Sequence, residues 1–394
     1  MNIKLSTFKS LLHKGEAFTD SNRLFLENIE KALGTKLELA DLDDYACDLK
    51  LIFIESGGSE GLFLKNYDKL QEPYYLLTSG NNNSLAASLE ILTYLNTHEK
   101  KGEVIHGSND YVVKRIKELY EYESTKKKLR NTKLGVIGKP SDWLISSIPN
   151  TNLLTEKLGV NLDVIDIKEV ENEYNKIGFL EIKRDFKEFD YNELYKAKKV
   201  YQAFANVVKK HELNGFTVRC FDLLTSLKTT GCLGLSLLND EGIISSCEGD
   251  IMALTSMVVA NTISGGYVFQ ANPSRIDVDK KEIVFAHCTI PLNMTKDYYF
   301  DTHFESLTGV AIKGYLNEED VTVLRISSDL KNYFLEEGKI VKNLESNNLC
   351  RTQIEVKFDN DISNILKHPC GNHHIIFYGR WKDKIQKFLD EALK

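Results

Sequence analysis

The chain has 394 residues, of which 42% are hydrophobic and 27% are charged, and its formal net charge is −7 at pH 7. This length favours two or three domains, and the composition is typical of a folded protein rather than a disordered or fibrous one. The negative net charge, with basic and acidic residues mixed along the sequence, argues against a nucleic-acid partner.

Seven cysteines are widely spaced and include no Cys-x-x-Cys pair, which argues against a disulfide framework or a structural zinc site and favours reduced thiols. The first twenty residues are charged throughout and contain no signal-peptide core. No segment reaches the roughly 18 apolar residues of a membrane span. We therefore expect a cytoplasmic protein with no membrane partner.

The first third of the sequence alternates between helical and strand patterns, which predicts an α/β domain with a parallel sheet. Ser84 follows a polar turn and is a candidate N-cap for the helix after it. A change from acidic to basic residues after position 122 indicates a solvated helix end and linker. The predicted strands are 48–54 and 74–77, and the predicted helices are 18–33, 85–97 and 110–122.

A new strand at 133–138 begins a second α/β domain, and the pattern changes again after residue 265. Short alternating runs in this last part predict a β-rich, barrel-type domain. The sequence therefore predicts three domains, at 1–132, 133–264 and 265–394. The further predicted strands are 162–167, 215–220, 282–288, 310–314, 321–326 and 374–378, and the further helices are 192–213 and 232–238.

The most informative stretch is Cys247-Glu248-Gly249-Asp250, which lies between an apolar strand and a helical pattern. An acidic pair at such a junction lies where α/β proteins bind ligands, at the carboxyl end of a strand and the positive end of a helix. Asp250 is well placed as the N-cap of the following helix, because its carboxylate can accept a backbone N–H. Glu248 is then the better candidate for a ligand or a base.

Histidines in the β-rich part are further candidates. His373 and His374 are adjacent, so in a strand at most one of them can face a given site. His287 and His303 lie in two other polar clusters, the second of which also contains Glu305. Each of these clusters can serve either ligand binding or ordinary packing.

Several stretches, taken together in chain order, resemble the L-fucose/L-arabinose isomerase superfamily, and specifically its shorter fucose-isomerase-like members. The resemblance implies two Rossmann-like α/β domains followed by a β-rich, barrel-type domain. It also implies a homo-oligomer, a trimer or hexamer, that interconverts aldoses and ketoses with Mn²⁺ or another divalent cation. The matching stretches are Ser56–Glu60, Asn83–Leu85, Ile137–Leu144, Leu238–Ile243, Cys247–Asp250, Ala286–Thr289, His303–Ser306 and Asn372-His373.

The resemblance places the family's glutamate and histidine metal ligands on Glu248 and His373, and its aspartate ligand on Asn272. An asparagine oxygen can bind a metal, but it carries no charge and takes up no proton at neutral pH. Either the metal is then held more weakly, or another acid takes part in catalysis. The catalytic candidates are Glu248, Asp250 and Glu305, with Asp277 as a further nearby acid, and the predicted contacts to the monosaccharide are Asn83, Ser84, Trp143, His287 and His303.

The mechanism implied is proton transfer between C1 and C2 of an open-chain sugar through an enediol, assisted by the cation. Two alternatives stay open. A non-catalytic sugar-binding or regulatory homologue would keep the fold without an aspartate at position 272. An isomerase for a sulfonated or phosphorylated sugar would need an anion pocket, for which Arg219, Arg275 and Arg351 are candidates.

Overall fold

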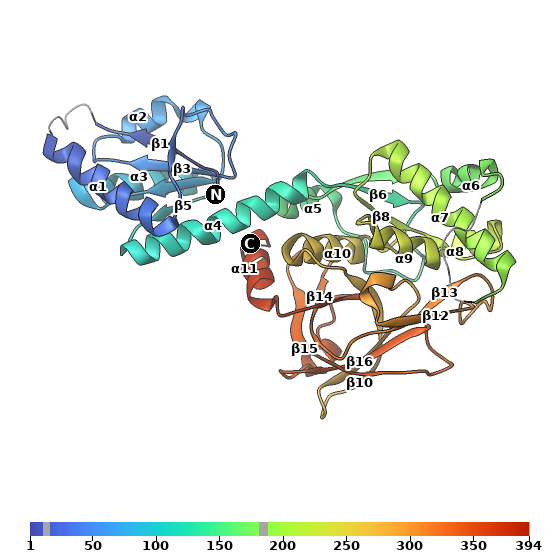
Figure 1. The fold of residues 1–394 in the computed structure, drawn as a ribbon. Helices are drawn as coiled ribbons and strands as arrows, with labels where there is room; N and C mark the ends of the chain where they lie inside the picture. Colours follow the sequence, from blue (N-terminus) through green and yellow to red (C-terminus); the bar gives the residue numbers. More distant parts are fainter. Residues whose placement is uncertain (11–15, 181–187, 394) are drawn as a thin grey trace. The chain divides into compact units, whose positions relative to one another are not determined.

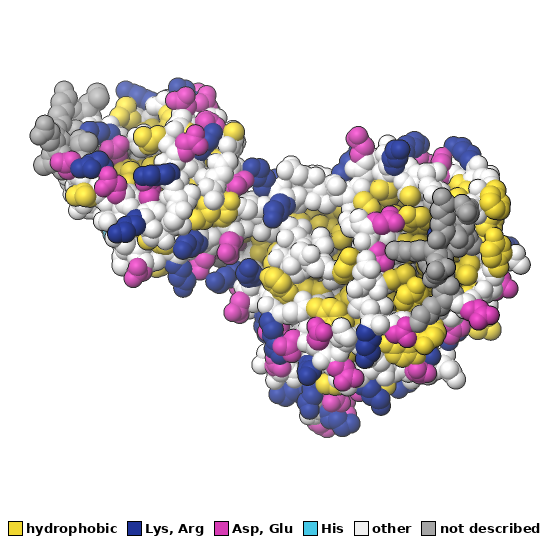
Figure 2. Space-filling model, in the orientation of Figure 1, with side chains coloured by type: hydrophobic (Ala, Val, Ile, Leu, Met, Phe, Trp, Pro, Cys, Tyr) yellow, Lys and Arg dark blue, Asp and Glu magenta, His cyan; other side chains and the backbone are white. Residues whose placement is uncertain are grey.

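The computed structural model describes residues 1–10, 16–180 and 188–393, and the chain divides into two compact units, Met1–Lys127 and Lys128–Lys394 (Figure 1). None of the helices in these described ranges combines the length and apolar character needed to cross a membrane. Basic and acidic side chains are interspersed over the visible face of each unit, in agreement with the mixed charge pattern of the sequence (Figure 2).

The first unit is a five-stranded parallel sheet, in the order β2-β1-β3-β4-β5, with helices on both faces. Strand β3 (Leu49–Ile54) is buried at every position. Its residues alternate between a core shared with α1 and α4 and a core shared with α2 and α3, as expected for a central parallel strand. The other elements are β1 (Ile3–Phe8), β2 (Glu38–Leu39), β4 (Tyr74–Leu77), β5 (Gly102–Ile105), α1 (Glu16–Leu33), α2 (Glu60–Lys65), α3 (Ser84–Thr97) and α4 (Asn109–Arg130).

Two local predictions for this unit are wrong. Ser84 does not cap α3: Asn83 holds the N-cap position in a left-handed conformation, and the Ser84 hydroxyl accepts a hydrogen bond from Thr78 Oγ1 at 2.7 Å. The charged stretch after residue 122 is not a linker, because α4 continues to Arg130. The basic residues form the last turns of this helix, and Lys127 among them pairs with Asp48 at 2.8 Å.

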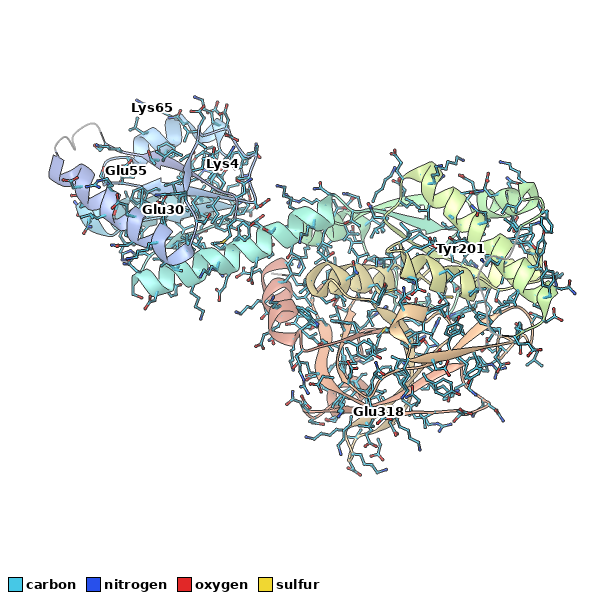
Figure 3. All side chains as sticks on the ribbon, viewed as in Figure 1. Lys4, Glu30, Glu55, Lys65, Tyr201 and Glu318 are labelled. Carbon is cyan, nitrogen blue, oxygen red and sulfur yellow. The ribbon has the colours of Figure 1, made fainter. Side chains whose placement is uncertain are left out.

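The second unit begins with a four-stranded parallel sheet in the order β7-β6-β8-β9. Helices α7 and α9 pack closely: Tyr201 of α7 donates a hydrogen bond to Glu241 at 2.7 Å, and a side chain at Gly234 of α9 would lie 3.1 Å from the Tyr201 Cα (Figure 3). The elements are β6 (Lys133–Ile137), β7 (Asn161–Ile165), β8 (Gly215–Val218), β9 (Ile244–Ser246), α5 (Thr151–Leu158), α6 (Ile167–Lys176), α7 (Tyr191–His211), α8 (Cys220–Ser226), α9 (Cys232–Asp240) and α10 (Ile251–Ser264).

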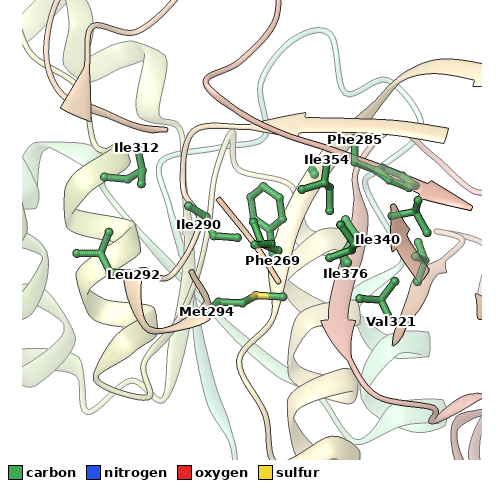
Figure 4. Packing of buried hydrophobic residues seen from close by; sticks show 14 of the residues in the cluster. Phe269, Phe285, Ile290, Leu292, Met294, Ile312, Val321, Ile340, Ile354 and Ile376 are labelled. Carbon is green, nitrogen blue, oxygen red and sulfur yellow. The ribbon is translucent and has the colours of Figure 1, made fainter. Parts of the chain in front are cut away.

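A closed antiparallel barrel follows, in the order β10-β11-β16-β15-β14-β17. Apolar side chains such as Phe269, Phe285 and Ile376 fill it (Figure 4). Helix α10 contacts β8 and β9 of the sheet as well as β14 and β17 of the barrel, so Ile251–Ala260 is buried throughout. The elements are β10 (Phe269–Asp277), β11 (Glu282–His287), β14 (Asp320–Ile326), β15 (Tyr333–Asn343), β16 (Thr352–Phe358), β17 (His374–Tyr378), the separate pair β12 (Asp297–Asp301) and β13 (Ala311–Tyr315), and α11 (Lys382–Ala392).

The predicted fold class is confirmed: two Rossmann-like parallel sheets are followed by a β-barrel. The division into three domains at residues 132 and 264 stays a prediction. The two compact units separate near residue 127, and the second sheet and the barrel lie in the same unit.

Candidate functional site

The candidate site is built around the loop after β9, at the carboxyl end of the second sheet. Glu248 in this loop has a φ of 65°, a left-handed conformation that is uncommon for a residue other than glycine and is found at functional sites. The loop after β6 holds it from two directions. The Ser141 N–H donates to the Glu248 carbonyl at 3.0 Å, and Trp143 Nε1 donates to Glu248 Oε2 at 2.6 Å.

Gly249 allows these two loops to approach. It has a φ of 70°, and a Cβ at this position would lie 2.6 Å from the carbonyl oxygen of Lys139 and 2.9 Å from the Cα of Pro140. Both the conformation and the space therefore require glycine.

Three side chains converge at this loop from distant parts of the sequence. Glu248, His287 at the end of β11 and His373 before β17 each offer one ligand atom, and these atoms all lie within 4.8 Å of one another. Among the residues that the structure describes, no other group of three His, Cys, Asp or Glu side chains meets this criterion. His373 Nε2 is buried without a hydrogen-bond partner and lies 3.6 Å from Glu248 Oε1. The structure thus brings together Glu248 and His373, two of the three ligands expected from the sequence, and adds His287.

Asp250 lies directly behind this cluster and is fully buried. Its Oδ1 accepts the backbone N–H of Ala253 at 2.8 Å, which confirms the predicted N-cap of α10. Its Oδ2 lies 2.8 Å from His373 Nδ1 and 3.1 Å from Arg325 Nη1. Because a carboxylate can only accept, His373 Nδ1 carries a hydrogen, and Nε2 faces Glu248 and His287.

The ionisation of these groups follows from their neighbours. Burial raises the pKa of Glu248, but His373, His287 and Trp143 outweigh it and lower this pKa to about 2. Burial opposes ionisation of Asp250 in the same way, and Arg325 and His373 lower its pKa to about 2. Both carboxylates are therefore charged at neutral pH.

The two histidines differ because only one has close carboxylate partners. Burial lowers the pKa of His373, but Asp250 and Glu248 outweigh it and raise this pKa to about 9. Burial, followed by the nearby His373, lowers the pKa of His287 to about 4. His287 is thus a neutral imidazole at pH 7, and His373 holds a proton between two carboxylates.

A cavity of about 410 Å³ opens in front of the cluster. This volume is suitable for a monosaccharide. The lining combines polar groups with the rings of Trp143, Phe221 and Phe304. Asn272 Oδ1 is buried without a hydrogen-bond partner, and Asn372 also lines the cavity. Within the described part of the chain, no Lys or Arg lines this cavity.

Six of the ten predicted site residues line this cavity, and four do not. Asn83 and Ser84 belong to the first unit. Asp250 and His373 are fully buried and do not line the cavity, although His373 belongs to the cluster. The predicted residues that line the cavity are Trp143, Glu248, Asn272, His287, His303 and Glu305.

The three arginines considered for an anion pocket have other partners. Arg219 forms ion pairs with Asp142 and Asp222, and Arg351 forms one with Asp301. The guanidinium of Arg275 donates to Ser346 at 3.4 Å. None of the three lines the cavity in the described part of the second unit.

His373 and His374 face different surroundings, as their adjacency predicts. The His374 ring packs against Phe285 and Phe334 in the barrel, with centroids 5.9 and 5.1 Å away. Burial lowers its pKa to about 3, so it is a neutral core residue. Of these two adjacent histidines, only His373 contributes to the cluster.

Two residues that support the site were not predicted from the sequence. Gln270 holds the loop after β9 by accepting the Cys247 N–H at 2.8 Å. Arg325 pairs with Asp250 from inside β14. A single arginine within a buried strand pattern was a signal that could have identified Arg325, because a buried guanidinium requires a partner. The seven cysteines are all free, as expected.

The chemistry of these atoms fits a divalent cation. One carboxylate and two imidazole nitrogens converge, His373 Nε2 and Asn272 Oδ1 are buried without partners, and the second nitrogen of each imidazole is held by Asp250 or Thr289. The fold and the site together define an α/β and barrel protein with a candidate metal centre at the carboxyl end of a parallel sheet.

Comparison with known proteins finds that the chain is similar to one named group of enzymes. No protein-family model matches the sequence. The chain is 26% identical over 270 residues to proteins named sulfoquinovose isomerase from Priestia aryabhattai and Priestia megaterium, which covers 64% of this chain and 60% of each relative. A protein of the same name from Clostridium sp. is 31% identical over 91 residues, covering 23% of this chain and 20% of that protein. The matched region thus spans about 60% of the length of the first two relatives.

Proposed function

We propose that this protein is a metal-dependent aldose-ketose isomerase of the L-fucose/L-arabinose isomerase group that acts on an anionic monosaccharide. The observation that carries the proposal is the convergence of Glu248, His287 and His373 beside a cavity of sugar size. The similarity to proteins named sulfoquinovose isomerase supports both the reaction and the substrate class, because sulfoquinovose is an aldose that bears a sulfonate.

Glu248, His287 and His373 would hold the cation, with Asn272 as a neutral oxygen ligand from the same lining. Mixed carboxylate and imidazole ligands suit Mn²⁺ or another first-row divalent cation. When bound, the ion polarises the carbonyl and neighbouring hydroxyl of an open-chain sugar. His287 was expected to contact substrate, and its neutral imidazole within the cluster supports a ligand role instead.

Glu305 is the carboxylate that we assign to proton transfer. Glu248 has a pKa of about 2 and is directed at the cluster, so it is a weak base. Both oxygens of Asp250 are engaged by protein groups, which supports a positioning role. Glu305 lines the cavity and is exposed, which supports a role in moving the C2 proton of an aldose to C1 while the O2 proton passes to O1.

The remaining proposed contacts concern the sugar hydroxyls and the anionic group. His303 lines the cavity, and its Nδ1 lies 3.2 Å from the Ser306 hydroxyl, which leaves Nε2 for a sugar hydroxyl. The lining offers the Asn372 amide as a neutral donor to a sulfonate. A second copy of the chain in a trimer or hexamer would bring further groups, including the predicted contacts Asn83 and Ser84.

The test follows exchange of the C2 proton into D₂O by NMR, with sulfoquinovose and unmodified aldoses, in the presence of Mn²⁺ or of EDTA. We expect exchange with an anionic aldose, loss of exchange with EDTA, and loss in Glu248→Gln. Glu318→Gln, in an exposed loop of the second unit, is the matched control (Figure 3). Absence of both exchange and Mn²⁺ binding with every sugar would overturn the proposal.

A second candidate function is non-catalytic sugar binding, which Asn272 favours because it removes a charge from the position of the family's aspartate. In that case calorimetry would detect binding of the sugar, whereas the same NMR experiment would detect no exchange at any Mn²⁺ concentration.

A further inference from the structure

Arg325 is the most unusual buried residue of the second unit. It lies in β14, and its side chain has no exposed surface. The neighbouring strand residues Val323, Leu324 and Ile326 are also fully buried. Removing a guanidinium from water costs several kcal/mol unless its donors are satisfied, so its partners show what it is used for.

The three nitrogens of the guanidinium bind three different loops. Nη2 donates to the Ser147 hydroxyl at 2.9 Å, Nη1 donates to Asp250 Oδ2 at 3.1 Å, and Nε donates to the Cys370 carbonyl at 3.2 Å. The first loop carries Trp143, the second carries Glu248, and the third carries His373. A single side chain thus connects the two loops that carry Glu248 and His373 with the loop whose Trp143 holds Glu248.

The third loop lies directly on the guanidinium. Gly371 has a φ of 125°, and a Cβ there would lie 2.6 Å from Arg325 Nη2 and 2.8 Å from Nε. Any larger residue would push the loop away from Arg325. His373 follows two residues later. The distance between this loop and Arg325 therefore determines how far the His373 imidazole reaches into the cluster.

We propose that Arg325 is a positioning residue of the candidate metal centre. It fixes Asp250, and Asp250 orients His373 with Nδ1–H directed at the carboxylate and Nε2 directed at Glu248 and His287. Arg325 also holds the loops after β6 and before β17 in fixed positions relative to Asp250. The part of this proposal that concerns metal affinity rests on the proposed function. The orientation of His373 does not.

The first test measures Mn²⁺ affinity by calorimetry and thermal stability in EDTA for Arg325→Lys and Ser147→Ala. Lysine keeps the charge but cannot bind three loops, so we expect Arg325→Lys to weaken Mn²⁺ binding by roughly 10- to 100-fold, as for other groups that orient a metal ligand. Ser147→Ala removes one of the three partners and should weaken binding by a smaller factor. Arg380→Lys alters an ion-paired arginine of the same barrel and should leave Mn²⁺ affinity unchanged.

The outcomes separate positioning from a general structural role. If Arg325→Lys lowers the melting temperature but binds Mn²⁺ as tightly as the wild type, the proposal is wrong. If Arg325→Lys does not fold, Ser147→Ala decides, and an unchanged Mn²⁺ affinity in that variant contradicts the proposal.

The second test reads the His373 tautomer without metal. Long-range ¹H–¹⁵N spectra at alkaline pH, assigned with His373→Gln, should show the Nδ1–H form in the wild type and a mixture of tautomers in Arg325→Lys. An unchanged Nδ1–H form in Arg325→Lys would overturn the proposal. A wild-type protein that binds no Mn²⁺ but loses the Nδ1–H form in Arg325→Lys would refute the proposed function and leave the positioning role in place.

Discussion

The carboxyl ends of the two parallel sheets carry different kinds of buried polar side chain. In the first unit, the fully buried polar groups of the turns after β3 and β4 are neutral: Ser56 accepts the Ser10 N–H at 3.1 Å, and Thr78 donates to Ser84 at 2.7 Å. In the second unit, the loop after β9 carries Glu248 and Asp250, which meet two buried histidines and a buried arginine.

This difference favours the second sheet as the location of the functional site. Hydroxyl groups bonded to one another or to the backbone stabilise a turn and need no further partner. Buried charges cost several kcal/mol each, and groups with strongly shifted pKa values cluster at functional sites. The position of ligand sites at the carboxyl ends of parallel strands is a general rule, and here the charged groups distinguish one sheet from the other.

The largest expected effect comes from removing the carboxylate of the cluster. Glu248→Gln takes one negative charge from beside the cation and should weaken Mn²⁺ binding on the order of 100-fold or more. Calorimetry on metal-stripped protein measures this change. The matched variant is Glu55→Gln, after β3 of the first unit, which should bind Mn²⁺ like the wild type. Equal losses in both variants would break the contrast between the two sheet ends.

The second effect is the pH dependence of stability in EDTA. The pKa of His373 is raised from 6.5 to about 9 in the folded state, so its proton stabilises the fold. This contribution is complete below pH 6.5 and is lost as pH rises through 9. We expect urea unfolding to show a fall of about 1–3 kcal/mol over this range, and His373→Gln to abolish that part of the fall. His98→Gln, on the surface of the first unit, should leave it in place.

The third effect restores the charge that the family's aspartate would supply. Asn272→Asp adds a carboxylate beside the cluster and should tighten Mn²⁺ binding by about tenfold. The same change should lower stability in EDTA, because the new charge lies near Glu248. Asn317→Asp, in an exposed loop of the second unit, controls for net charge. Unchanged affinity in Asn272→Asp would show that position 272 does not contact the ion.

Local sequence patterns predicted the fold class, several strands of each sheet and of the barrel, and the N-cap of α10, because these depend on periodicity and on residues three positions apart. The pairing of His287 with His373 was beyond such patterns. It depends on the barrel order, in which β10 lies between β11 and β17. Arg325 is 75 residues from Asp250 and 178 from Ser147, and only the packed fold brings these partners together.

The resemblance to the isomerase family predicted a shared site for Glu248 and His373, whose side chains lie in one cluster, and the role of Ser84 stays a prediction. The smallest expected effect concerns this residue. Ser84→Ala leaves the buried Thr78 hydroxyl without its acceptor and should lower the free energy of unfolding by about 1 kcal/mol. Mn²⁺ affinity should not change, because the hydrogen bond only stabilises the turn before α3. Urea unfolding and calorimetry measure the two quantities on the same preparation. A weaker Mn²⁺ affinity without loss of stability would mean that the neutral turn of the first unit also serves the metal centre. The two sheets would then both contribute to one site in the assembled protein, and the contrast between their side chains would not separate a functional sheet end from a structural one.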